Sequence, residues 1–265
     1  MKAMGIDLGG SGFRIGVFDT STVELLHPLL HHSHASSTAP EDVLPTLVQA
    51  IEGLGWMGPI GLGFPGAIEA SKPTTAPNLG EAWLTVDVGA ALHRFHGGAF
   101  AMLNDADAVA LAEAQHGGGH AGHDCVLTLT VGTGLGTTVH QNGTMVLNLE
   151  YGRLPHPSKS GCLEEHLSGA ARTRHGWSLE EWASRFQEGL THLETMVQPG
   201  RIILYGGIME HWNTIHPLIE TDAELVAAVL TDTAGPLGAA LTAVGALHPV
   251  SYTHLRAHET EADLV

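Results

Sequence analysis

The chain has 265 residues, of which 43% are apolar and 15% charged, and its formal net charge is −17 at pH 7. This length allows one large hydrophobic core or two modest ones. The acidic balance argues against nucleic acid as a partner, because broad nucleic-acid surfaces need clustered Lys and Arg that displace counterions from phosphates. No apolar run approaches the roughly 18 residues needed to span a bilayer, so a membrane is not an expected partner either.

The first residues and the cysteine content indicate a cytoplasmic protein. Asp7 follows Met1 too closely for an apolar signal peptide, so the cytoplasm is the expected location. Cys125 and Cys162 are the two cysteines. By themselves they neither make a disulfide framework nor fill a zinc site.

A tight glycine turn between two strand-like runs opens the chain. Residues 4–19 predict a hairpin whose turn is Gly9-Gly10-Ser11-Gly12. Glycines let backbone N–H groups approach an anion closely, and the Ser11 hydroxyl can add a contact. Asp7, at the end of the first strand, is a candidate Mg²⁺ ligand, directly or through water. An ordinary hairpin is the alternative interpretation of this turn.

Connectors and one helix follow. Residues 27–37 predict a polar connector with four histidines; a solvated loop is favoured over the alternative, a metal-binding tract, because no Cys or carboxylate shares the cluster. Pro40 lies near the first turn of a predicted amphipathic helix. The GxGxxG match at residues 61–66 is not expected to bind a dinucleotide, because Pro65 makes the following stretch a loop rather than a helix. A substrate loop that ends near Asn78 fits better.

The candidate catalytic centre lies at Asn104-Asp105, between a strand-like run (99–103) and a helix-like run (108–115). Open α/β sheets bind ligands at such strand ends. Asp105 could serve as a general base, as a metal ligand or as a helix cap, and capping alone is the commoner role. Three glycine-rich turns, each able to hold a phosphate, favour the general base.

The second half of the chain repeats the first hairpin. The strand predicted at Cys125–Val131 leads into Gly132-Thr133-Gly134-Leu135-Gly136, after which a strand resumes. Two such hairpins facing each other across a cleft would clamp a phosphate chain from both sides. A long amphipathic helix is predicted over 180–196, and the buried strand at 201–208 ends in Gly206-Gly207. Residues 248–265 have no apolar face and predict a disordered, non-native tail.

In this order the motifs resemble the ROK family of sugar kinases and related repressors, within the actin-like ATPase superfamily. The resemblance extends from residue 4 to about residue 247. Residues 55–66 and 177–183 are also similar to stretches of the polyphosphate glucokinase branch. The motifs that carry the resemblance are Asp7-Leu8-Gly9-Gly10-Ser11 with Arg14, Leu103-Asn104-Asp105-Ala106, Gly132-Thr133-Gly134-Leu135-Gly136, Glu150-Tyr151-Gly152-Arg153 and Tyr205-Gly206-Gly207.

The resemblance implies an α/β, two-lobed actin-like (ribonuclease H-like) ATPase fold with a central cleft. Residues 1–104 would form a small N-terminal lobe with the first phosphate hairpin. Residues 105–247 would form a larger C-terminal lobe with the second hairpin and the sugar- and nucleotide-binding segments. A homodimer is the expected assembly.

The resemblance also assigns site residues. Asp105 resembles the catalytic base, and Asn104 and Glu150 resemble sugar ligands, joined by Glu164 and Asn78. Arg153 stands where the family usually has a His that contacts the sugar. The residues expected to hold phosphate or nucleotide, with Mg²⁺ at Asp7, are Asp7, Gly9, Gly10, Ser11, Arg14, Gly132, Thr133, Gly134, Gly136, Gly206 and Gly207.

The implied activity is a glucokinase that transfers a phosphoryl group from inorganic polyphosphate, with ATP as an alternative or additional donor, to the 6-hydroxyl of glucose. One alternative is an ATP-dependent hexokinase of the family acting on glucose or another hexose. Another is a non-catalytic, sugar-binding regulatory protein, against which the presence of Asp105 argues. A third alternative is a sugar-sensing repressor of the family. Such repressors carry a DNA-binding segment before the Asp7-type motif, whereas three residues precede Met4, so a repressor is not favoured.

Two further expectations concern zinc and the donor. The family's zinc loop survives only as Gly161-Cys162-Leu163-Glu164, so the protein should contain no zinc. Polyphosphate needs cationic groups along its path. The local basic residues are Arg153, Lys159, Arg172 and Arg174. These residues either form such a path or pair with neighbouring acids such as Glu164 and Glu165. The resemblance to the polyphosphate branch favours the path.

Overall fold

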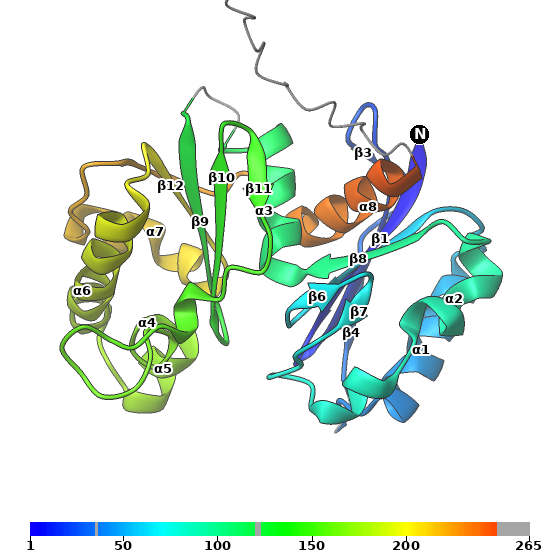
Figure 1. Ribbon diagram of the computed structural model, residues 1–265, viewed down its shortest axis with the longest axis horizontal. Coiled ribbons are helices and arrows are strands. Elements are labelled where there is room, and N and C mark those ends of the chain that lie inside the picture. Colours follow the sequence, from blue (N-terminus) through cyan, green and yellow to red (C-terminus); the bar gives the residue numbers. More distant parts are fainter. Residues whose placement is uncertain (35–36, 120–122, 248–265) are drawn as a thin grey trace, which may run out of the picture.

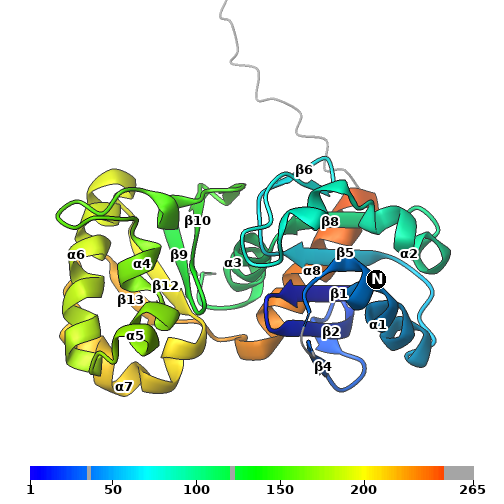
Figure 2. The same ribbon diagram turned by 90° about the horizontal axis from the view of Figure 1, so that it is seen from below.

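Two β-sheets, each with helices packed on it, form two lobes on either side of helix α3 (Asp105–His116), as Figures 1 and 2 show. This computed structural model describes residues 1–34, 37–119 and 123–247, and the tail predicted at 248–265 lies outside them. Within these ranges no helix is both long and apolar enough to cross a membrane.

The first sheet has the order β3-β2-β1-β5-β8, with β4 also paired to β2. β1 and β2 form the predicted antiparallel hairpin, whereas β5 and β8 run parallel to β1. The carboxyl ends of β1, β5 and β8 therefore lie along one edge. The strands are β1 (Lys2–Gly9), β2 (Gly12–Asp19), β3 (Glu24–Leu25), β4 (Leu30–Ser33), β5 (Ile60–Phe64) and β8 (Phe100–Asn104).

Helices cover both faces of this sheet. α1 (Pro40–Gly53) and α2 (Val88–His96) contribute to a hydrophobic core that includes Ile6, Leu47 and Leu62. The last helix, α8 (Ala234–Leu247), contacts β1, β5 and α3. Glycines allow its close approach, because a Cβ at Gly5 would lie 1.7 Å from the Pro236 carbonyl oxygen. The lobe predicted as 105–247 included α8, whereas in the structure this helix packs on the first sheet.

The second sheet has the order β11-β10-β9-β12-β13. The predicted long helix is α6 (Leu179–Val197), which starts at a capping box of Ser178 and Glu181 and buries Trp182 completely. α4 (Glu164–Leu167), α5 (Gly169–His175) and α7 (Trp212–Ile215) lie in the same lobe. The strands are β9 (Cys125–Val131), β10 (Leu135–Gln141), β11 (Thr144–Val146), β12 (Arg201–Tyr205) and β13 (Glu224–Ala227).

One predicted loop is wrong in part. The connector expected at 27–37 contains β4, whose Ser33 pairs with Gly12 of β2. His31 and His32 are exposed on this edge strand, which is held by backbone pairing rather than by an apolar face, so the strand gave no hydrophobic pattern.

The remaining elements are short. β6 (Ile68–Glu69) and β7 (Lys72–Pro73) form a small hairpin. The short 3-10 helices are η1 (Glu81–Thr85), η2 (Tyr151–Arg153), η3 (Gly207–His211), η4 (His216–Leu218) and η5 (Thr231–Thr233).

Candidate active site

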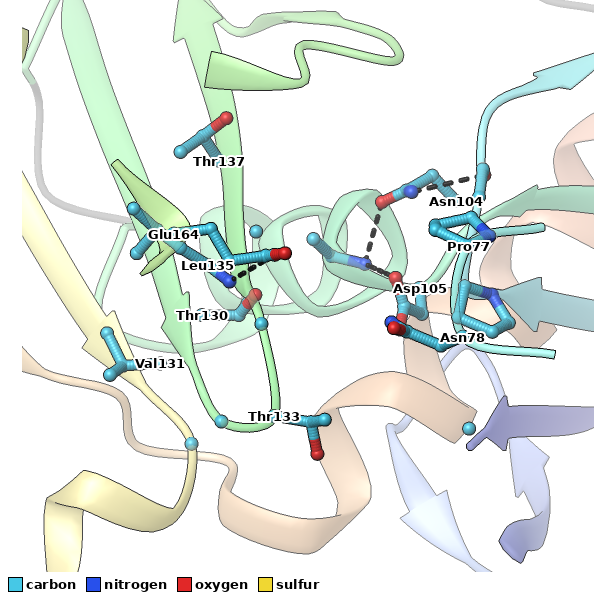
Figure 3. Close-up of a pocket in the computed structure, with 18 of the residues that line it drawn as sticks. Pro77, Asn78, Asn104, Asp105, Thr130, Val131, Thr133, Leu135, Thr137 and Glu164 are labelled. Carbon is cyan, nitrogen blue, oxygen red and sulfur yellow. Dashed lines mark hydrogen bonds between the residues drawn. The ribbon is translucent and has the colours of Figure 1, made fainter. Parts of the chain in front are cut away.

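The turns of both glycine hairpins and the end of β8 border one cavity of about 220 Å³ between the lobes (Figure 3). Asn78, Asn104 and Asp105 approach it from one side, and Thr133 and Glu164 from the other. The structure therefore brings most of the predicted site residues together. Those that line the cavity are Gly9, Gly10, Ser11, Asn78, Asn104, Asp105, Gly132, Thr133, Gly134, Gly136, Glu150, Arg153, Glu164 and Gly206.

Asn104 and Asp105 reach the cavity because β8 ends where α3 begins. The N-cap of α3 is Asn104, whose Oδ1 accepts the N–H groups of Ala106 (2.8 Å) and Asp107 (3.2 Å). Its Nδ2 donates to the Gly66 carbonyl at 3.1 Å. Asp105 Oδ1 shares the Ala106 N–H at 2.8 Å. No hydrogen bond from a described residue engages the second Asp105 oxygen, which remains able to accept a proton.

The surroundings of Asp105 make its carboxyl group basic. Burial, chiefly, raises the pKa of Asp105 to about 8, and the nearby negative charge of Asp7 adds to the effect. The Ala106 N–H opposes this rise, while Glu150 and Asp107 contribute to it. A base that titrates close to neutral pH can take up a proton during a reaction and release it afterwards.

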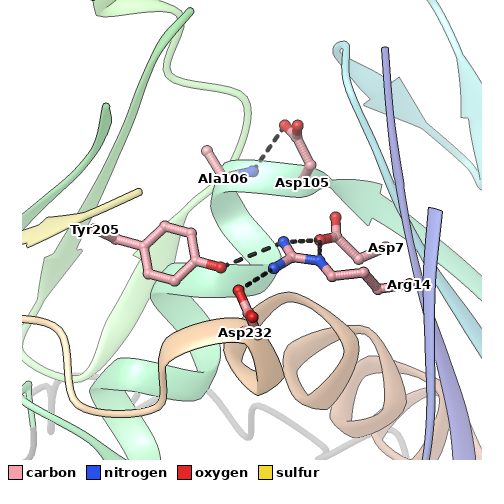
Figure 4. A network of polar contacts seen from close by, with 6 residues as sticks. All are labelled: Asp7, Arg14, Asp105, Ala106, Tyr205 and Asp232. Atoms are coloured by element: carbon pink, nitrogen blue, oxygen red, sulfur yellow. Dashed lines mark hydrogen bonds and ion pairs between the residues drawn. The ribbon is translucent and has the colours of Figure 1, made fainter. Parts of the chain in front are cut away.

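Arg14 joins Asp7 to the second lobe (Figure 4). Asp7 Oδ2 accepts from Arg14 Nε at 3.1 Å and also from Arg14 Nη2. The same guanidinium donates to Asp232 Oδ1 at 3.0 Å and to the Tyr205 hydroxyl at 3.3 Å. Burial raises the pKa of Asp7, and the positive charge of Arg14 opposes that rise. Arg14 was predicted to bind phosphate, but in the structure it is engaged by Asp7, Asp232 and Tyr205.

Asp7 and Arg14 line a second, adjoining cavity of about 270 Å³, which Gly9 and Ser11 also border. The first glycine turn therefore separates a charged cavity from the one that contains Asp105. Gly207, predicted to hold nucleotide, is among the lining residues of neither cavity.

The second glycine hairpin is held by elements that follow it in sequence. Leu135 N–H donates to Glu164 Oε2 at 3.0 Å, and Ala170 N–H donates to the Gly132 carbonyl at 3.1 Å. Glu164, a predicted sugar ligand, is thus tied to a predicted phosphate hairpin. The Thr137 hydroxyl donates to the Leu149 carbonyl and accepts the Tyr151 N–H, which fixes the loop that carries Glu150.

Glu150 and Arg153 form a loose pair at the cavity. Arg153 Nε lies 3.8 Å from Glu150 Oε2. Burial raises the pKa of Glu150, the charge of Arg153 opposes the rise, and Glu164 adds to it. Arg153, which stands where the family's His was expected, therefore contacts a predicted sugar ligand.

Sequence reasoning missed several lining residues. Thr130 and Tyr205 line the cavity, as do Pro65 and Pro77. The signal for Thr130 was available, since it stands two residues before the second glycine turn just as Asp7 stands before the first. Tyr205 offered no comparable signal, because its hydroxyl acquires a role only when the second lobe meets Arg14.

The basic residues fall into two groups. Arg153 and Lys159 pair with Glu150 and Glu188, respectively. Arg172 and Arg174 have no ion pair with any described residue. The alternative pairing with Glu164 and Glu165 does not occur; these carboxylates accept backbone N–H groups of Leu135 and Cys162.

Arg185, which was not predicted, joins the unpaired group. It also has no ion pair with a described residue, and its guanidinium lies 4.1 Å from the centre of the Trp177 ring. The other arginines of the described ranges are all ion-paired: Arg14, Arg94, Arg153 and Arg201. Arginines without an ion pair to a described residue therefore lie on α5, which contacts the second glycine turn at Ala170, and at Arg185 of α6.

Known proteins match both the sequence and the fold. A model of the ROK family matches residues 3–176. Polyphosphate glucokinase from Mycobacterium tuberculosis is 33% identical over 241 residues, which cover 91% of this chain and 90% of the relative.

Among solved structures, the inorganic polyphosphate/ATP-glucomannokinase of Arthrobacter sp. strain KM is 31% identical, with a TM-score of 0.85 over 92% of this chain and 98% of that one. A ROK family glucokinase from Streptomyces griseus, solved with glucose and AMPPNP, is 21% identical with a TM-score of 0.75 over 91% of this chain and 98% of that one, and it supports the fold alone. The predicted two-lobed actin-like fold is confirmed.

Proposed function

Because the chain belongs to the ROK family, we propose that it phosphorylates the 6-hydroxyl of glucose, with inorganic polyphosphate as donor and ATP as a second donor. One observation carries the proposal: the predicted base, the predicted sugar ligands and both glycine turns border a single cavity. Relatives named for this activity, aligned over nine-tenths of the chain, support the choice of sugar and donor.

A sugar hydroxyl is a weak nucleophile, so the transfer depends on positioning and on charge. Asp105 accepts the hydroxyl proton on its free oxygen as the oxygen–phosphorus bond forms. Asn104 and Glu150 hold neighbouring sugar hydroxyls, with Glu164 and Asn78 beside them. The bond to the leaving phosphate breaks at the same time, and the two glycine turns hold the phosphates in line by their N–H groups.

Asp7 has the properties of a Mg²⁺ ligand. It stands at the end of β1 beside the first glycine turn, and no hydrogen bond from a described residue engages its Oδ1. Mg²⁺ prefers oxygen ligands and is commonly held by one or two carboxylates together with substrate phosphates. A Mg²⁺ ion held there would neutralise the negative charge that develops on the donor. The positive charge of Arg14 opposes the burial that raises the pKa of Asp7, and its hydrogen bonds orient the carboxyl group.

The unpaired arginines support polyphosphate as a donor. Arg172 and Arg174 lie on α5, whose Ala170 N–H donates to the Gly132 carbonyl of the second glycine turn, and Arg185 lies on α6; none of the three has an ion pair with a described residue. In a chain with a net charge of −17, a group of unpaired cations attracts a polyanion that extends from the cavity. The phosphate chain of ATP ends at the nucleoside, so ATP would not need these three arginines.

Steady-state assays with glucose, Mg²⁺ and either long-chain polyphosphate or ATP test the proposal. We expect glucose 6-phosphate from both donors, and Asp105→Asn is the inactive control. Turnover with ATP and none with polyphosphate at any salt concentration would make the protein an ATP-dependent glucokinase. Absence of glucose phosphorylation with either donor, from a folded protein that binds glucose, would support the non-catalytic alternative.

A further inference from the structure

Asn148 connects the two lobes beside the cavity in the way that a neighbouring strand would. Its side-chain Oδ1 accepts the Ile68 N–H at 2.9 Å, and its Nδ2 donates to the Ile68 carbonyl at 3.0 Å. Ile68 belongs to β6, which follows β5 of the first sheet, whereas Asn148 follows β11 of the second sheet. One amide side chain therefore satisfies both backbone groups of a residue 80 positions away.

The backbone of Asn148 is fixed to α3. Asn148 N–H donates to Asp107 Oδ2 at 2.9 Å, while Asp107 Oδ1 accepts the Thr138 hydroxyl at 2.8 Å. Asp107 is 1% exposed. Burial raises its pKa to about 6, against the two hydrogen bonds that favour the ionised form. Asp107 stands two residues after Asp105, so this hydrogen bond joins the Asn148 loop to the helix that carries the base.

Both sides of this connection border the cavity. Leu149 and Glu150 follow Asn148 directly and line it, and Pro65 and Gly66 precede Ile68 and line it from the other lobe. Gly66 also accepts the Asn104 side-chain amide at 3.1 Å. A sugar held between Asn104 and Glu150 would therefore lie inside a ring of contacts that Asn148 closes.

Asparagine suits this position for two reasons. Its φ is 58°, in the left-handed region that Asn and Gly adopt more readily than other residues. Its amide has one donor and one acceptor group on the same plane, as the Ile68 backbone requires. Aspartate lacks the donor, and glycine keeps the backbone but lacks the amide.

We propose that Asn148 is a positioning residue that closes the two lobes around the sugar by pairing with the Ile68 backbone. This inference rests on the proposed function for the identity of the sugar. The contact sets the distance between Glu150 and Asn104 and contributes to sugar affinity. The Asn148 side chain has no hydrogen bond with a described residue of either glycine turn, so we expect donor affinity to depend little on it.

Asn148→Gly tests the inference, because glycine preserves the left-handed backbone and removes only the amide. We expect the KM for glucose to rise by about fivefold or more, since two neutral hydrogen bonds are lost, and the KM for either donor to change by less than about twofold. The matched control is Asn142→Gly in the β10–β11 turn. Asn142 also has a positive φ, of 50°, and its side chain has no hydrogen bond with a described residue.

Hydrogen exchange at the Ile68 amide gives a readout that does not depend on activity. In the unmodified protein this amide should be protected, and more so with glucose; in Asn148→Gly the protection should fall, while Asn142→Gly stays like the parent. A glucose KM within twofold of the parent value in a folded Asn148→Gly protein would overturn the inference. If the parent protein phosphorylates no glucose, the proposed function fails, and exchange at Ile68 without sugar still decides whether Asn148 joins the lobes.

Discussion

In the hairpin of β1 and β2, Asp7 lies opposite Arg14, whereas in the hairpin of β9 and β10 the corresponding residues are Thr130 and Gly136. Both hairpins present a glycine turn to the same cavity. The first places an ion pair behind its turn, and the second places a neutral hydroxyl opposite a residue without a side chain. A repeated backbone has thus acquired two different electrostatic environments.

Close packing explains the difference on the second side. A Cβ at Gly136 would lie 2.2 Å from Thr130 Oγ1 and 2.5 Å from Ala106 Cβ. The first turn of α3 therefore packs directly on the second hairpin, and this contact helps to fix the position of Asp105. The first hairpin therefore controls charge, while the second fixes the base and, through Glu164, a predicted sugar ligand.

The largest expected effect comes from Asp105→Asn, which removes the base between the two hairpins. The amide keeps the shape of the side chain but cannot accept the hydroxyl proton. We expect kcat to fall by about 10²-fold or more with glucose affinity largely unchanged. Turnover assays together with calorimetric glucose binding measure the two quantities, and near-parental turnover in a folded variant would remove Asp105 from the mechanism.

The pair Asp7→Asn and Thr130→Val tests the comparison directly, because the two residues occupy equivalent positions. Asp7→Asn should lower kcat by about 10²-fold and raise the Mg²⁺ concentration needed for half-maximal rate, since a carboxylate ligand is lost. Thr130→Val should lower kcat by less than about tenfold and leave the Mg²⁺ requirement unchanged. Equal effects of the two substitutions on the Mg²⁺ titration would contradict the division of roles.

Arg172→Ala combined with Arg174→Ala should act on the side of the second hairpin alone. The KM for long-chain polyphosphate should rise by about three- to tenfold, because two charge-assisted contacts are lost, and the KM for ATP should remain nearly constant. The polyphosphate effect should shrink at high salt. Arg94→Ala is the control, since Arg94 is exposed and paired with Glu52 on the first lobe. An equal rise in both donor KM values would exclude a path specific to polyphosphate.

A smaller effect concerns stability. The pKa of Asp105 is about 8 in the folded protein, against an ordinary value of 3.8. Between these values the folded state retains a proton that the unfolded state releases, so the free energy of unfolding falls as the pH rises. Asp105→Asn removes this dependence. We therefore expect the Tm of the variant to exceed that of the parent by a margin that grows to a few degrees between about pH 4 and pH 8. A margin independent of pH would contradict the raised pKa.

The local sequence predicted much of the fold, and packing supplied the rest. The two hairpins, α6 and the step from β8 into α3 follow from turn glycines, capping residues and apolar periodicity, all of which act within a few residues. The return of α8 to the first sheet depends on Gly5, where the absence of a side chain permits contact with a helix more than 220 residues later. Such long-range fit leaves no periodic pattern in a single sequence.

The site shows the same limit. Residues beside glycine turns and at strand ends could be predicted, because backbone geometry places them at a cavity whatever surrounds it. The contact of Arg14 with Tyr205 could not be predicted, since it requires the second lobe to contact the first; the pairing of Arg14 with Asp7 lies within the predicted hairpin, where the two residues are opposite each other. The role of Asn148 could not be predicted for the same reason as the Tyr205 contact: its partner Ile68 lies in the other lobe.

The smallest expected effect is that of metal chelation on stability. We expect no structural zinc beside the second hairpin, whereas Mg²⁺ is expected at the first. The loop that leads to Glu164 beside the second hairpin is held by hydrogen bonds: Pro155 pairs with Cys162, and His156 Nδ1 accepts the Ser158 and Lys159 N–H groups at 3.2 Å each. Within the described ranges no group of three or more His, Cys, Asp or Glu residues is arranged to hold a metal ion.

We therefore expect a strong chelator to leave the Tm within about 1 °C of its starting value, since removal of a structural zinc would cost far more. Activity should be lost on chelation and restored by Mg²⁺ alone, because the metal acts at the first hairpin. Metal analysis of tag-free protein and thermal unfolding with and without chelator measure both quantities. Stoichiometric zinc, or a Tm that falls on chelation and recovers with zinc, would place a metal beside the second hairpin. The expected difference between the hairpins, a metal at the first and none at the second, would then be wrong.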